Sequence, residues 1–119
     1  MAHDDHPINI VSHPARVCVR RGGVPIADTR RALTLFEASY PGVRYLPRAD
    51  VNMSLLRRSE YTTRCPYKGL ASYFSIVTPD GVVENAVWCY EKPLPVAAEI
   101  ADYLAFDTRH VSIADEHAS

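Results

Sequence analysis

One segment of the chain has the pattern of two β-strands joined by a tight turn. Residues 70–77 (LASYFSIV) and 82–90 (VVENAVWCY) are rich in β-branched and aromatic side chains, which favour strands. Between them stands Thr78-Pro79-Asp80-Gly81, with proline second and glycine last, an order typical of a type I turn. The segment therefore predicts an antiparallel hairpin over residues 70–90.

Several other short segments also have the composition of strands. In Arg16–Arg21, Val17 and Val19 alternate with polar residues, and Gly22-Gly23 follows as a turn before a partner strand at Val24–Ala27. Strands are further expected at Leu33–Phe36, Val43–Leu46, Tyr61–Arg64, Ala105–Phe106 and His110–Ile113, with a short one at Ile8–Val11.

Two segments favour helical structure. Pro47–Leu56 is expected to hold a short helix or a 3₁₀ turn. After Pro95, Val96, Ile100 and Leu104 recur every four residues, which predicts one C-terminal amphipathic helix. The expected fold class is mainly β (α+β), a small antiparallel sheet of barrel-like or β-tent-like form with that one helix.

The length of 119 residues fits a single domain. We expect an N-terminal arm at 1–14, one compact β-rich domain at 15–113 and a flexible tail at 114–119. No apolar run approaches the roughly 20 residues of a membrane-spanning helix, and the N-terminus lacks a signal pattern. The three widely spaced cysteines fit free thiols in a reducing compartment, so a cytoplasmic protein without membrane association is expected.

Charge is unevenly distributed along the chain. The net charge is only −1, which gives no reason to expect nucleic acid as a partner. From Arg44 to Lys68, however, six basic residues stand against two acidic ones, a local charge of +4. An anionic ligand would be attracted to such a segment if its charges gather on one surface; the alternative is that each charge is simply solvated.

The stretch TTRCPYKG, residues 62–69, lies within this cationic segment. A thiol reacts as its thiolate, which a neighbouring cation stabilises, so Cys65 beside Arg64 is the candidate nucleophile. Lys68 is one of only two lysines, and Gly69 after it would permit close backbone approach to an anion or a polar group. The alternatives are a half-buried structural cysteine and a solvated lysine at a turn.

Aromatic side chains flank the same stretch. Tyrosine and tryptophan often line ligand pockets, where an apolar ring carries one polar group. A pocket formed by Tyr45, Tyr73, Trp88 and Tyr90, with Lys68 and Arg64 as cationic anchors and Asp50 to orient a hydroxyl or pair with Lys68, is the leading functional hypothesis. Core packing is the alternative for each aromatic residue.

No metal site and no cofactor are expected, because the sequence has no CxxC or HxxxH pattern. Three readings of function stay open. The first is a module that binds a small anionic or polar molecule, the second an enzyme that uses Cys65 in redox or acyl chemistry, and the third an interaction domain without a small-molecule site. The oligomeric state is open, and a homodimer is possible.

Four motifs together resemble a known family: YLPRADV at residues 45–51, TxCPYKGxASY at 63–73, WCYEKP at 88–93 and LAF at 104–106. They are similar to the bacterial and fungal family called domain of unknown function 427, over about residues 6–113. The resemblance implies a small, compact, mainly β domain. The label nucleotidyltransferase-like is sometimes attached to that family, but the paired carboxylates that hold two divalent ions in nucleotidyl transfer are missing here.

Overall fold

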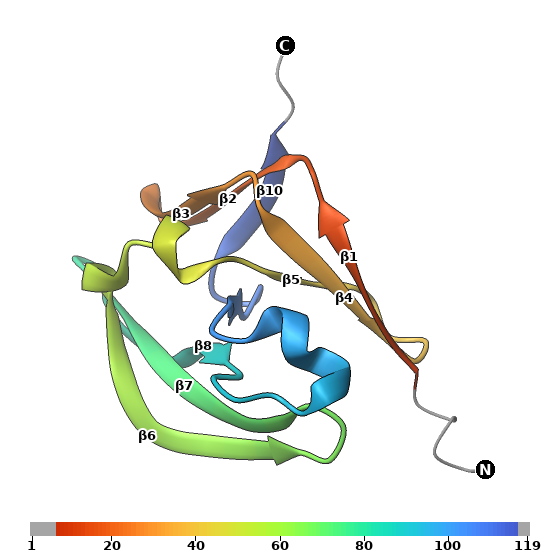
Figure 1. The fold of residues 1–119 in the computed structure, drawn as a ribbon. Helices are drawn as coiled ribbons and strands as arrows, with labels where there is room; N and C mark the ends of the chain where they lie inside the picture. Colours follow the sequence, from red (N-terminus) through yellow and green to blue (C-terminus); the bar gives the residue numbers. More distant parts are fainter. Residues whose placement is uncertain (1–6, 117–119) are drawn as a thin grey trace.

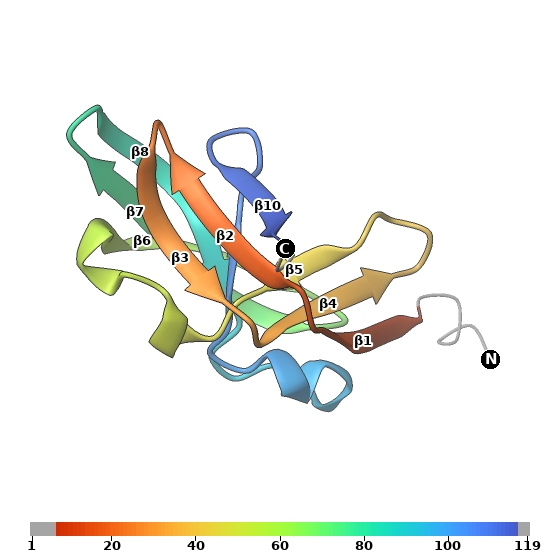
Figure 2. The ribbon, with the colours of Figure 1, turned by 90° about the horizontal axis from the view of Figure 1, so that it is seen from above.

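The computed structural model describes residues 7–116, which form three antiparallel sheets (Figures 1 and 2). Their strand orders are β1-β4-β5, β10-β2-β3 and β6-β7-β8-β9. The strands are β1 Ile8–His13, β2 Arg16–Arg21, β3 Val24–Thr29, β4 Ala32–Glu37, β5 Val43–Tyr45, β6 Leu56–Cys65, β7 Gly69–Thr78, β8 Gly81–Cys89, β9 Leu104–Phe106 and β10 Ser112–Glu116. Three short 3₁₀ helices complete the elements: η2 Arg48–Asp50, η3 Met53–Leu55 and η4 Pro95–Ile100.

The structure is mainly β as expected, but its strands form three antiparallel sheets and not one small sheet. The predicted hairpin is present. β7 and β8 pair in antiparallel register, with Tyr73 opposite Trp88, and the turn between them ends at Gly81 with φ +123°. Glycine tolerates this left-handed conformation, whereas a side chain would strain it. The strand expected at residues 16–21 is β2, with the same bounds, and its Val17 and Val19 are both buried.

The predicted C-terminal amphipathic helix is wrong. Pro95–Ile100 is a 3₁₀ segment interrupted at Ala97, and the chain turns away at Asp102, whose φ is +66°. Leu104, which was expected on the helix, instead lies in β9 and pairs with Cys89 of β8. Backbone pairing with β8 thus outweighs the local periodicity. Within residues 7–116, no helix is long and apolar enough to cross a membrane.

A backbone bridge joins the first sheet to the third. The amide of Leu46 donates to the carbonyl of Leu104, and the amide of Leu104 donates back to Leu46, both at 2.8 Å. Leu46 directly follows β5, and Leu104 begins β9, so strands far apart in the sequence lie side by side. A second bridge, between Ala27 and Val51, ties β3 to the segment between η2 and η3.

Two apolar clusters lie on opposite faces of the third sheet. Successive residues of a strand point to opposite faces. Accordingly, Phe74 and Val87 pack into a cluster with β2 and β3, whereas Ala71 and Tyr90 pack into another. That second cluster takes its remaining members from the first sheet and from η4: Leu35, Tyr45, Ala97 and Ile100, with Ala105 of β9. Figure 1 shows η4 beside β4 and the lower strands of the third sheet.

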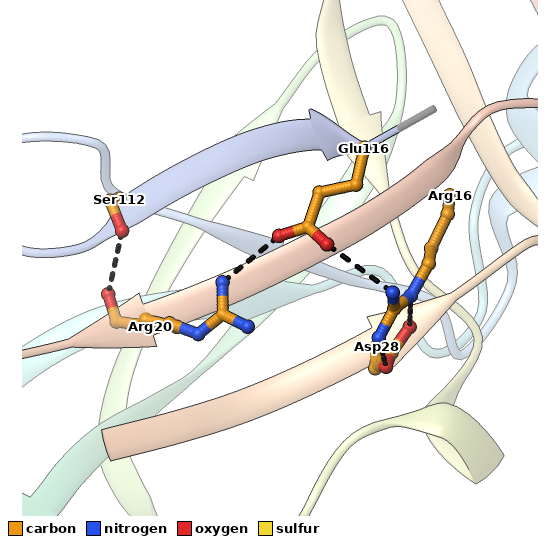
Figure 3. Close-up of polar contacts among 5 residues, drawn as sticks. All are labelled: Arg16, Arg20, Asp28, Ser112 and Glu116. Carbon is orange, nitrogen blue, oxygen red and sulfur yellow. Dashed lines mark hydrogen bonds and ion pairs between the residues drawn. The ribbon is translucent and has the colours of Figure 1, made fainter. Parts of the chain in front are cut away.

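An ion-pair ladder covers the outer face of the second sheet (Figure 3). The guanidinium group of Arg16 donates two hydrogen bonds to Asp28, at 2.9 and 2.6 Å. Glu116 of β10 accepts from both Arg16 and Arg20. Cys18 is buried on the strand between these two arginines. The ladder therefore fastens β10 to β2 and covers the Cys18 thiol.

Both ends of the described chain belong to sheets. β1, which lies in the segment expected as an N-terminal arm, pairs along its whole length with β4. β10 extends to Glu116, inside the segment expected as a tail. Residues 1–6 of that arm and 117–119 of that tail lie outside the described residues.

Asp115 of β10 links the second sheet to the first. It accepts from Arg44 of β5 at 3.1 and 3.0 Å, and His13 of β1 lies 2.9 Å away. The other ring nitrogen of His13 is 3.3 Å from the hydroxyl of Thr34. Hydrogen bonding to Arg44 holds the pKa of Asp115 below its ordinary value.

A buried leucine at the bridge between sheets should be important for stability. We expect Leu46→Ala to lower the free energy of unfolding by about 2–5 kcal/mol, because it leaves a cavity in the core. Leu70→Ala on β7, where the side chain is 45% exposed, is the matched control and should change it by less than about 1 kcal/mol. Urea unfolding measures both, and equal effects would contradict the assigned packing.

Acid should weaken the link made by Asp115. Because its pKa is lowered in the folded state, the stabilisation is present above the ordinary aspartate pKa of about 4 and is lost as the pH falls through the lowered value. Asp115→Asn should therefore destabilise the protein at pH 7 and reduce the loss of stability between pH 7 and about pH 2. Asp80→Asn, in the exposed β7–β8 turn, removes the same charge far from Arg44 and is the matched control. Superimposable curves for Asp115→Asn and the parent would refute this role.

Candidate functional site

A cavity of about 380 Å³ opens where the first sheet meets the third. We call it the aromatic cavity. β4 and β5 supply one wall, β7 and β8 the other, and the loop between β4 and β5 forms its edge. Its lining residues are Leu35, Glu37, Tyr40, Pro41, Val43, Tyr45, Lys68, Tyr73, Trp88 and Tyr90. Five of the residues singled out in the sequence, four aromatic and one cationic, therefore meet in one place.

Lys68 and Glu37 form an ion pair at this cavity. The Lys68 ammonium donates to a carboxylate oxygen of Glu37, and only 9% of the lysine side chain is exposed. The same ammonium lies 5.7 Å from the centre of the Tyr90 ring, a cation–π distance. A lysine so deeply buried is rare unless it is paired, so Lys68 is a buried, paired residue and not a solvated turn residue.

The backbone around Gly69 fixes the position of Lys68. Gly69 has φ +112°, a left-handed conformation that suits glycine. The Lys68 carbonyl accepts a hydrogen bond of 2.9 Å from the amide of Leu94, in the segment that leads into η4. That segment covers Gly69 and keeps it from lining the cavity. Gly69 thus influences the cavity only by setting the backbone conformation next to Lys68.

Burial or hydrogen bonding holds three of the cavity's tyrosines in place. The indole N–H of Trp88 donates to the hydroxyl of Tyr45 at 3.2 Å, and Tyr45 is only 2% exposed. Burial raises the pKa of Tyr45 and likewise that of Tyr90, so both phenols stay neutral at physiological pH. Tyr73 shares a 3.0 Å hydrogen bond with Thr63. The cavity therefore has rigid aromatic walls with neutral hydroxyl groups.

Asp50, Arg64 and Cys65 lie outside this arrangement. Asp50 accepts from the Thr29 hydroxyl at 2.6 Å and pairs with Arg31, so its partner is not Lys68. Arg64 is exposed on β6. Cys65 ends β6 opposite Gly69 and packs half-buried against the second cluster, without lining the cavity.

The cationic segment does not form one positive surface. Three of its five arginines turn toward carboxylates from distant parts of the chain: Arg44 toward Asp115, and both Arg48 and Arg58 toward Glu91. Lys68 is offset by Glu37 in the same way. A sum of charges along the sequence does not include these partners, which come from β4, from β10 and from the loop after β8.

Glu37 is the functional candidate that the sequence reasoning missed. It ends β4, where Leu33 and Leu35 alternate onto the face that packs into the second cluster. Continued alternation puts Glu37 on that same inward face. The signal in the sequence was that Glu37 follows Leu33 and Leu35 at alternate positions and so shares their side of the strand.

The polar groups of this cavity can donate and accept hydrogen bonds. Within the described part of the chain, no cysteine, serine or histidine lines it. Nor does any group of three or more His, Cys, Asp and Glu residues in the described ranges lie close enough to hold a metal ion. Its polar groups are a paired lysine and glutamate, the indole N–H and phenol hydroxyls.

The three thiols should differ in reactivity. Burial raises the pKa of Cys18 and of Cys89, which lowers their thiolate fraction, whereas Cys65 is half-buried. With iodoacetamide at pH 8 we expect Cys65 to be alkylated first and the other two only as the protein unfolds. Mass spectrometry of the parent and of Cys65→Ser measures the order. Cys18 or Cys89 reacting as fast as Cys65 would contradict the burial described here.

Comparison with known proteins places the chain in a family. No curated protein matches it. Residues 9–117 match the family described as Domain of unknown function (DUF427), which covers every strand named above except the first residue of β1. The resemblance seen in the four sequence motifs is thus confirmed over nearly the whole chain. The protein belongs to the domain of unknown function 427 family.

Proposed function

We propose that the aromatic cavity binds a small polar molecule through Lys68 and Glu37. The observation that carries the proposal is the ion pair between buried Lys68 and half-buried Glu37, on the wall of a cavity of about 380 Å³ that is otherwise lined mostly by aromatic and aliphatic side chains. Small-molecule sites have volumes of about 300–1,000 Å³ and combine apolar walls with a few placed polar groups. Burial of a charged pair costs desolvation energy, so the pair is poorly explained as a source of stability alone.

The pair favours a ligand group that both accepts and donates hydrogen bonds. An ammonium group has three N–H donors, of which Glu37 accepts one, and a carboxylate has two acceptor oxygens. A neutral carboxamide can accept from Lys68 and donate to Glu37 without separating the two charges. A simple anion would bind Lys68 but meet the negative charge of Glu37. The carboxamide-like group is therefore the better complement.

Three probes with the same ring separate these possibilities. Benzamide offers an acceptor and a donor, benzoate only acceptors, and benzylammonium only donors. Trp88 is the only tryptophan of the chain and lines the cavity, so its fluorescence reports binding. We expect benzamide to bind about tenfold more tightly than either charged probe, the value of one hydrogen bond to a charged group.

The two lysines supply a matched control. Lys68→Met should abolish the response to benzamide, and Lys92→Met, at an exposed position, should preserve it. Glu37→Gln, which keeps the shape but removes the offsetting charge, should shift the preference toward benzoate. Tightest binding of benzoate by the parent, no response to any probe, or equal loss in both lysine variants would refute the proposal.

A further inference from the structure

A second cavity, of about 550 Å³, adjoins the aromatic cavity. We call it the side cavity. The two share Tyr40, Pro41, Val43 and Trp88, so they adjoin at the β4–β5 loop and at the indole ring. Beyond Trp88, the side cavity is closed by Phe106 of β9 and Ile113 of β10. Figure 2 shows β10 lying beside β5 in this region.

The side cavity is suited to an apolar group. Its inner walls are rings and aliphatic side chains, and its charged groups are already paired. Arg44 makes two hydrogen bonds to Asp115, and Asp107 accepts from Arg109 at 2.7 Å. Hydrogen bonding to Arg109 also lowers the pKa of Asp107, so that carboxylate stays ionised and paired. A charged ligand would have to break one of these pairs, whereas an apolar body would leave both in place.

We propose that the natural ligand is an elongated amphipathic molecule: a carboxamide-like head at Lys68 and Glu37, and an apolar body that crosses Trp88 into the side cavity. This inference rests on the function proposed above, which supplies the site for the head. It adds the class of molecule, a polar head with a short aliphatic or aromatic tail. The shared wall at Tyr40 and Trp88 is the point where head and tail join.

A series of primary amides tests the length of the tail: acetamide, butanamide, hexanamide and octanamide. Each buried methylene contributes about 0.8 kcal/mol, so affinity measured by Trp88 fluorescence should rise about three- to fourfold per methylene until the side cavity is filled. Thr108 is exposed at the rim of the side cavity and does not line the aromatic cavity. Thr108→Phe should weaken octanamide by about tenfold or more and leave acetamide unchanged.

Thr62→Phe, at an exposed position of β6 away from both cavities, is the matched control and should change neither affinity. Unchanged acetamide binding by Thr108→Phe also shows that this variant is folded. If acetamide binds but affinity does not rise along the series, or if Thr108→Phe spares octanamide, the inference is overturned while the proposed function stands. If no amide binds, both are overturned.

Discussion

Two reciprocal hydrogen bonds between Leu46 and Leu104 determine how the sheets of this protein meet. They join the first sheet, in which β4 ends at Glu37, to the third sheet, in which β7 begins directly after Lys68. Because the join is made by backbone groups, it fixes the angle of two curved sheets without relying on flexible side chains. The space left between them is closed by η4 on one side and remains open at the aromatic cavity. The proposed site is therefore a consequence of how the sheets are joined.

Inside that space, the ion pair and the rings support one another. Burial of Lys68 among aromatic side chains strengthens its attraction to Glu37 but also makes its charge costly without that partner. Tyr90 lies close enough to the ammonium for a cation–π contact, and the phenol of Tyr45 holds the indole of Trp88. A polar pair fixed in an apolar cavity needs little rearrangement to receive a ligand, and such preorganisation favours binding.

The sequence predicted local strands and turns better than the contacts between distant segments. Alternation and turn residues located the β7–β8 hairpin and β2, and the four aromatic residues singled out in the sequence line one cavity. The four-residue periodicity after Pro95 failed because Leu104 gains two strand partners, which no local pattern reveals. Asp50 was expected to orient a hydroxyl or pair with Lys68, but it pairs with Arg31. Glu37, the actual partner, reaches Lys68 only through the pairing of distant strands.

The burial of Lys68 beside Glu37 is the central claim, and amine acetylation tests it most directly. The chain has only two lysines, and Lys92 is exposed. With an acetylating reagent at pH 8 and peptide mass spectrometry, we expect rapid modification of Lys92 and protection of Lys68 until the protein unfolds. Acetylation of Lys68 at the rate of Lys92 in the folded protein would show that Lys68 is not buried.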